Sequence, residues 1–168
     1  GDPRRVIDNT EEDIDDPGVV IVISSNSKLS GSVSNARCVI LKEDAEVTGE
    51  VSANNNISLG EKAQIKGEVE AGGNVSLGEK AQIKEEVEAG GNVSLGEEAQ
   101  IKEEVEAGGN VSLGEKAQIE DNVCAGGSVS LDPKSVVKGD VTAGGSITVD
   151  KQAQIKGEAN SGATCEDD

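Results

Sequence analysis

The chain has 168 residues, a net charge of −18 and a pI near 4.3. An acidic chain repels nucleic acid phosphates, and a chain without Phe, Tyr or Trp cannot stack rings on bases or sugars, so we expect no nucleic-acid partner. Without His the chain lacks the commonest general base and an imidazole metal ligand, so we expect neither an enzyme nor a bound cofactor.

The first 18 residues are rich in charge and contain Pro3 and Pro17, a composition that predicts an extended acidic arm. The longest apolar run, residues 19–23, is far shorter than the roughly 20 residues that cross a bilayer, so we expect no direct membrane insertion. Because the chain contains no Met, we expect its N-terminus to arise by processing. This favours an extracellular or cell-surface location, with a cytoplasmic one as the alternative.

From about residue 19 to residue 160 the sequence repeats with a period of 18 residues. A Gly-Gly pair begins at five positions with this spacing: Gly72, Gly90, Gly108, Gly126 and Gly144. We expect these glycines to form corners, because glycine accepts positive φ angles, and no GxGxxG or GxxxxGK pattern of a phosphate loop follows them. The period predicts about eight stacked coils, followed by a short tail over residues 161–168.

Apolar and polar residues alternate within each coil over three segments of six residues. This alternation is typical of short strands with one buried face, and the glycine pairs would break a helix. Stacked coils place equivalent side chains above one another at about 4.8 Å. The sequence therefore predicts an all-β, single-domain, triangular β-solenoid with these core ladders: Leu59, Leu77, Leu95, Leu113, Ile65, Ile83, Ile101 and Ile119.

Stacking also aligns polar residues on the outside of the predicted rod. One such row contains Asn56, Asn74, Asn92 and Asn110 and continues through Ser128 and Ser146. We expect the asparagines to form hydrogen bonds along the rod axis. Each also heads an Asn-x-Ser sequon, so N-glycosylation is the alternative if the chain is exported.

Glutamates form two further rows, which run through Glu70, Glu88 and Glu106 and through Glu61, Glu79, Glu97 and Glu115. Like charges about 4.8 Å apart repel each other, and neighbouring lysines offset part of this repulsion. We expect a solvated surface that keeps rods from associating sideways, with no metal site. Calcium binding between stacked carboxylates is the alternative, although the GGxGxDxUx pattern of calcium-binding β-rolls is absent.

We find no amphipathic helix that would cover either end of the predicted solenoid. Uncovered edges with matching strands predict head-to-tail contact between copies of the chain, so the expected partner is the chain itself, in a filament. Cys38 falls in the first coil and Cys165 in the last. The two are candidates for a disulfide across the junction, with two unrelated free thiols as the alternative. Cys124 replaces a glutamate of the outer row and is expected to be an exposed thiol. The three cysteines form no CxxC pair.

The stretch over residues 129–159, with Lys-Gly-Asp-Val at residues 138–141 and Lys-Gly-Glu at residues 66–68 and 156–158, resembles the bactofilins. The resemblance covers residues 23 to 160. It implies a right-handed triangular β-helix with about six residues per side. It also implies end-to-end polymerisation without nucleotide, and a role as a scaffold.

Two other classes of solenoid compete with this interpretation. Left-handed hexapeptide-repeat enzymes share the Leu-Gly-x-x-Ala pattern, but those families resemble one another in relying on His, so such a chain would be catalytically silent. A ligand-binding or ice-binding surface solenoid would need aromatic platforms or flat threonine rows, and the coils contain only Thr48, Thr142 and Thr148. A surface fibre that shares only the repeat pattern also remains open.

Overall fold

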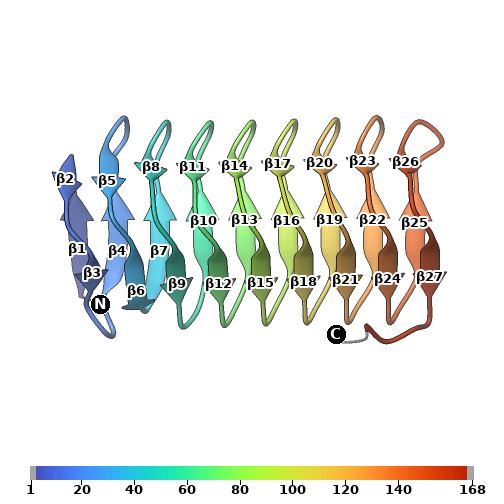
Figure 1. Ribbon diagram of the computed structural model, residues 1–168, viewed down its shortest axis with the longest axis horizontal. Coiled ribbons are helices and arrows are strands. Elements are labelled where there is room, and N and C mark those ends of the chain that lie inside the picture. The colour runs from blue at the N-terminus through green and yellow to red at the C-terminus, as the bar shows by residue number, and fades with distance from the viewer. Residues whose placement is uncertain (1–2, 166–168) are drawn as a thin grey trace.

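Each 18-residue repeat folds into three short strands joined by three tight corners, and successive repeats stack along one axis (Figure 1). The computed structural model describes residues 3–165. These residues contain 27 strands and no helix, arranged as three parallel sheets of nine strands each. Nine strands at the usual spacing of about 4.8 Å make a rod roughly 40 Å long. The β-solenoid predicted from the sequence is confirmed, with about nine coils in place of eight.

Sheet A begins with four-residue strands and continues with strands of three. It consists, in spatial order, of β1 (Arg4–Ile7), β4 (Val20–Ile23), β7 (Cys38–Leu41), β10 (Ile57–Leu59), β13 (Val75–Leu77), β16 (Val93–Leu95), β19 (Val111–Leu113), β22 (Val129–Leu131) and β25 (Ile147–Val149).

Sheet B has mostly two-residue strands. It consists of β2 (Thr10–Glu11), β5 (Lys28–Ser30), β8 (Glu46–Val47), β11 (Gln64–Ile65), β14 (Gln82–Ile83), β17 (Gln100–Ile101), β20 (Gln118–Ile119), β23 (Val136–Val137) and β26 (Gln154–Ile155).

Sheet C completes the triangle. It consists of β3 (Ile14–Asp15), β6 (Val33–Ala36), β9 (Val51–Ala53), β12 (Val69–Ala71), β15 (Val87–Ala89), β18 (Val105–Ala107), β21 (Val123–Ala125), β24 (Val141–Ala143) and β27 (Ala159–Ser161).

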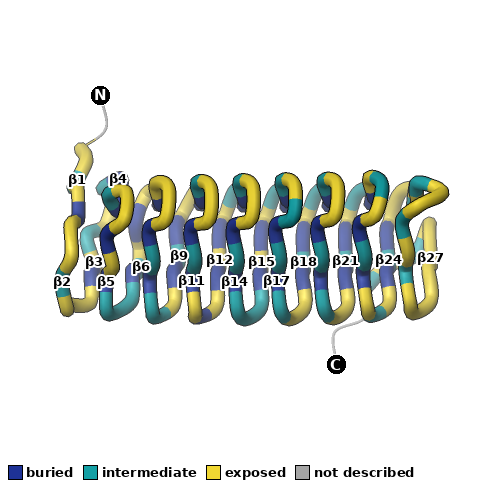
Figure 2. Tube along the Cα trace, turned by 90° about the horizontal axis from the view of Figure 1, so that it is seen from above, coloured by how far each residue is buried: buried dark blue, intermediate teal, exposed yellow. Residues whose placement is uncertain are grey.

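The core is a column of aliphatic side chains enclosed by the three sheets (Figure 2). In the central coils each residue pairs with its equivalent one full repeat later, so that Leu59 pairs with Leu77 and Ile65 with Ile83. All eight residues expected in the core ladders are buried: Leu59, Leu77, Leu95, Leu113, Ile65, Ile83, Ile101 and Ile119. The inward residues are Leu, Ile, Val and Ala, with Ser27 and Ser135 buried at the alanine position of their coils, which suits a narrow interior packed close to crystal density.

The corner between sheets A and B has a left-handed backbone residue that is not glycine. In residues 60–63, the Ala63 N–H donates to the Gly60 carbonyl at 3.1 Å, and Lys62 has φ +62°. This is the position where a type II turn needs positive φ. The Lys62 N–H then donates to the carbonyl of Glu79 in the next coil at 2.9 Å. The same conformation recurs at Asn26, Asp44, Lys80, Glu98, Lys116 and Lys134.

The corner glycines between sheets C and A are therefore needed for a different reason than the one predicted. None of Gly72, Gly90, Gly108, Gly126 and Gly144 has a positive φ. Instead, a Cβ on Gly90 would collide with the carbonyl oxygen of Gly72 in the coil before it, and the later pairs repeat this contact. Glycine is required here because two backbones pass too close for any side chain.

The first residues form a coil, and the expectation of an extended arm over residues 1–18 is wrong for the described part of that range. Strand β1 pairs with β4, β2 with β5 and β3 with β6. The offsets between partners depart from the regular repeat. The sequence separation between Ile7 and its partner Ile23 is shorter than the 18-residue repeat, and the separation between Thr10 and its partner Leu29 is longer. These irregular offsets hide the first coil from a search for a fixed period.

Candidate functional site

The asparagine row runs along the corner between sheets C and A as a continuous hydrogen-bonded ladder. The side-chain Oδ1 of Asn56 accepts from the backbone N–H of Asn74 at 2.8 Å, and Asn74 does the same for Asn92. The ladder continues from Asn92 to Asn110 and from Asn110 to Ser128, each at 2.8 Å, and then from Ser128 to Ser146. The axial hydrogen bonds expected from the sequence are present, and all four asparagines are exposed.

The second glycine of each corner pair leaves room for this ladder. A Cβ on Gly91 would collide with Oδ1 of Asn74, and one on Gly109 would collide with Oδ1 of Asn92. The Gly-Gly-Asn sequence is therefore one structural unit, in which the first glycine allows the coils to approach and the second admits the amide oxygen.

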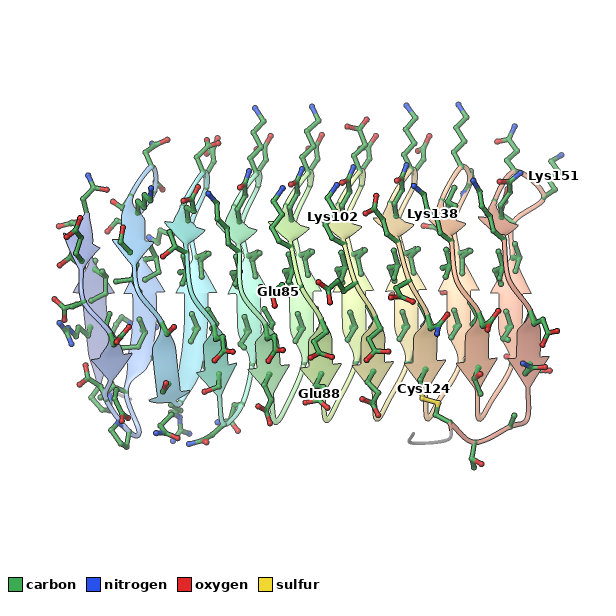
Figure 3. The ribbon with its side chains drawn as sticks, in the orientation of Figure 1. Glu85, Glu88, Lys102, Cys124, Lys138 and Lys151 are labelled. Atoms are coloured by element: carbon green, nitrogen blue, oxygen red, sulfur yellow. A yellow bond between two sulfur atoms is a disulfide. The ribbon has the colours of Figure 1, made fainter. Side chains whose placement is uncertain are left out.

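Two rows of carboxylates lie side by side on sheet C and on the corner between sheets B and C (Figure 3). Glu70, Glu88 and Glu106 are register partners in sheet C. The neighbouring corner row contains Glu68, Glu86 and Glu104. A hydrogen bond that the protonated carboxyl group of Glu86 donates to the carboxylate of Glu68, together with burial and the charges of Glu68 and Glu104, raises the pKa of Glu86 to about 7.

The sheet C row shows the same crowding. Burial, followed by the charges of Glu106 and Glu70, raises the pKa of Glu88. Lysines offset part of the acidic charge elsewhere, for example Lys102 at 3.8 Å and Lys138 at 3.6 Å from Glu120. Within residues 3–165, no group of three or more His, Cys, Asp or Glu side chains is arranged to hold a metal ion. The calcium alternative therefore has no candidate site among them.

The cysteines lie differently from the prediction. Cys165 forms a disulfide with Cys124, with 5.8 Å between their Cα atoms, while Cys38 is free and half-buried in β7. The proposed junction pair of Cys38 and Cys165 is therefore corrected, as is the expectation that Cys124 is a free thiol. The reason is that the chain leaves the coil path after β27 and turns back along the edge of sheet C, beside its corner with sheet A (Figure 1).

Beside the sheet C carboxylates runs a shallow groove of about 460 Å³. Its floor is a row of alanines and corner glycines, and its acidic wall is formed by Glu70, Glu88 and Glu106. One end of the groove holds Ala163, Thr164 and Cys165. The repeat pattern predicted the rows of glutamates and glycines. It did not predict that residues 163–165 occupy one end of the groove, because nothing in the repeat indicates that the chain changes direction at residue 162.

Ion pairs lie at the N-terminal end of the solenoid. Arg5 pairs with Ile21, which stands in the core ladder, so a cation occupies a core register position at this end. Its guanidinium lies 2.8 Å from Glu12 and 2.7 Å from Asp16. Sequence reasoning missed this contact. The available signal was the Val6-Ile7 dipeptide, which repeats Val22-Ile23.

The C-terminal end is apolar and open. Within the described residues β25, β26 and β27 are the last strands of their sheets. Val149 is 40% exposed although its register partners Leu131 and Leu113 are buried. Ile147 and Ile155 are only partly buried. Figure 2 shows the same contrast between this last coil and the central ones. The two ends therefore differ in charge: the first coil is strongly acidic, whereas the last coil is neutral and exposes Val149.

Comparison with known protein families gives a match. A model of the bactofilin family, described as polymer-forming cytoskeletal, matches residues 59–160. No curated protein and no solved structure matches the chain. Among the described residues there is no helix long and apolar enough to cross a membrane.

Proposed function

Since this chain belongs to the bactofilin family of polymer-forming cytoskeletal proteins, we propose that it is the subunit of a structural filament joined head to tail through the ends of its solenoid. The observation that carries this proposal is the open C-terminal coil. Its strand edges, which have no strand neighbour within residues 3–165, offer backbone groups to a second copy of the chain, and Val149 and Ile147 offer aliphatic surface.

Strand direction supports the head-to-tail arrangement. All strands within each sheet are parallel, so only head-to-tail stacking continues the same parallel hydrogen-bonding pattern across a junction. In this arrangement Val149 would pair with Ile7 of the next copy, because both residues belong to the same ladder of register partners. Contact between two identical ends would instead require antiparallel pairing.

Charge supports the same arrangement. Residues 3–18 contain two arginines and six carboxylates, so two N-terminal coils brought together would repel each other. Residues 147–162 contain two lysines and two carboxylates and are neutral. Contact between the acidic first coil and the neutral last coil avoids placing like charges face to face.

Electron microscopy and sedimentation of the purified chain and of Val149→Glu test the proposal. We expect filaments from the unmodified chain and monomers from Val149→Glu, because every head-to-tail contact needs one C-terminal end. The matched control is Ser94→Glu, which adds the same charge to the exposed outer face of β16, halfway along the rod. It should still form filaments.

Other outcomes would count against the proposal. Dimers of Val149→Glu would indicate that N-terminal ends join to each other. Filaments of unchanged length would show that the C-terminal coil is not the contact surface. Monomers of the unmodified chain across a range of salt and protein concentrations would reject the filament itself.

A further inference from the structure

The segment Gly162–Cys165 departs from the path that every preceding coil follows. At the equivalent corners the glycine pair leads from sheet C into sheet A with no positive φ, whereas Gly162 has φ +66°. The chain then runs back along the edge of sheet C, beside its corner with sheet A (Figure 1). There the Ala163 N–H donates to the Ala143 carbonyl at 3.0 Å, and the Gly162 N–H donates to the Gly145 carbonyl at 3.1 Å.

The disulfide fixes this reversed segment to the side of the rod. Cys124 lies in β21, two strands away from β27 in sheet C, and Figure 3 shows its sulfur joined to the returning segment. Ala125 and Ala143 under the segment are 0% exposed, whereas Ala71, Ala89 and Ala107 along the uncovered groove are 4%, 7% and 6% exposed. The segment is thus seated in the groove as well as covalently held.

The position of this segment determines whether the outer edge of β25, at the C-terminal end of the rod, is covered. Cys165 stands one full repeat after Ile147, so a chain that kept the coil path would lay Cys165 beside Ile147, the first residue at the outer edge of β25. With the segment held on sheet C, that edge has no strand neighbour among the described residues, and Val149 is exposed.

The coil path is sterically open to this segment. It would place Ala163 one coil after Gly145, where a Cβ would meet a serine hydroxyl, as a Cβ on Gly145 would meet Ser128. A serine side chain can rotate away, and the nearest backbone atoms around the Gly145 position lie 3.3 Å from such a Cβ. Sterically, the coil path is therefore available to the segment as an alternative to its observed position on the side of the rod.

We propose that the Cys124–Cys165 disulfide is a redox latch that keeps the C-terminal edge free for assembly; this inference rests on the proposed function. In the oxidised chain the segment lies on sheet C and β25 is open to a second copy. In the reduced chain the segment competes with that copy for the edge of β25, and assembly weakens.

The chemistry is ordinary thiol–disulfide exchange with a small dithiol. A thiolate of the dithiol attacks one sulfur of the half-buried disulfide, and the second thiolate completes the exchange. The Sγ–Sγ bond of the protein breaks, two electrons and two protons pass to Cys124 and Cys165, and the dithiol becomes a cyclic disulfide.

The test compares assembly of the oxidised and dithiol-reduced full-length chain by sedimentation, with alkylation and mass measurement to establish the state of each cysteine. Hydrogen exchange at the Ala163 amide reports the position of the segment independently of assembly. We expect reduction to speed exchange at Ala163 and to raise the critical concentration for filaments about tenfold, equivalent to about 1.4 kcal/mol. Cys124→Ser should behave as the reduced chain under both conditions.

Two matched variants isolate the latch. Cys38→Ser removes the free thiol and should respond to the dithiol as the unmodified chain does. A chain ending at Ser161 lacks the segment and should assemble equally well with and without the dithiol.

Each remaining outcome overturns a defined part of the argument. If the oxidised and reduced chains assemble equally although Ala163 exchange changes, the latch inference fails and the filament proposal stands. The inference also fails if reduction strengthens assembly or if oxidation leaves three free thiols. If no chain assembles, including the one ending at Ser161, the proposed function fails together with the inference.

Discussion

The Oδ1 atom of Asn74 accepts a 2.8 Å hydrogen bond from the backbone N–H of Asn92, one coil further along the rod. Asn92 repeats the contact to Asn110. Replacing Asn92 by Ala leaves the Asn110 N–H without its partner. A net loss of about 0.5–1.5 kcal/mol is expected for one such hydrogen bond.

Urea unfolding of Asn92→Ala, followed by circular dichroism, measures this loss. Asn92→Ser should lose less, because Ser128 already serves as an acceptor in the same ladder, at 3.1 Å from the Ser146 nitrogen. Equal stability of Asn92→Ala and the unmodified chain would show that the ladder is not stabilising.

Gly90→Ala should destabilise the rod by about 1–3 kcal/mol, the usual range for an overpacked site. The added Cβ would collide with the carbonyl oxygen of Gly72, a backbone atom that cannot rotate away. Gly78→Ala is the matched control, since its Cβ would lie 3.0–3.2 Å from its nearest neighbours and needs only a small shift. Thermal unfolding of the two variants should rank Gly90→Ala as clearly the less stable.

Lys62→Gly should stabilise the chain, by up to about 1 kcal/mol. Lys62 has φ +62°, a conformation that costs an L-residue roughly 1–2 kcal/mol and glycine almost nothing. The greater freedom of glycine in the unfolded chain offsets part of the gain. Lys66→Gly, further along the same coil and outside the positive-φ positions, should destabilise. If chemical denaturation gives Lys62→Gly a lower free energy of unfolding than the unmodified chain, the expectation is contradicted.

The crowded carboxylates predict that the stability contributed by Glu86 falls as pH rises. The pKa of Glu86 is about 7 in the folded chain, against an ordinary value of 4.5. Between these values the folded state binds more protons than the unfolded state, so unfolding becomes easier with increasing pH. Glu86→Gln removes this titration and should exceed the unmodified chain in stability at pH 8 but not near pH 4.5.

Melting temperatures of both chains from pH 4.5 to pH 8 measure the difference. Glu79→Gln removes a carboxylate from the corner between sheets A and B and serves as the charge-matched control. If the two variants show the same pH dependence relative to the unmodified chain, the raised pKa at Glu86 does not couple to folding.

The repeating part of the fold could be predicted from the sequence because its local and long-range signals agree. Leu77, Ile83 and Val87 alternate with polar neighbours, and the same residue types recur one repeat later, so period and burial pattern indicate the same coil. The asparagine ladder followed from stacking alone. The corner position of the glycines was predicted correctly, but the reason given for them, a positive φ, was wrong. The actual reason is the close approach of two neighbouring backbones, which the sequence of a single coil does not indicate.

The two ends could not be predicted in the same way. Arg5 and Thr10 occupy positions that are Ile21 and Leu29 in the next coil, so the apolar pattern that identifies a coil is missing. The sequence separation between paired residues is shorter than 18 between β1 and β4 and longer than 18 between β2 and β5, which also breaks the period. At the other end, Cys165 fits the repeat by number, and only the reversal at Gly162 brings it to Cys124.

The near identity of the central coils has a consequence for the length of the rod. Residues 77–94 and 95–112 differ only at one position, Lys80 against Glu98. Loss or duplication of one such block would therefore leave every inter-coil contact and both ends almost unchanged, while altering the rod by about 4.8 Å. The subunit's length can thus vary in whole-coil steps, independently of the surfaces that join one subunit to the next.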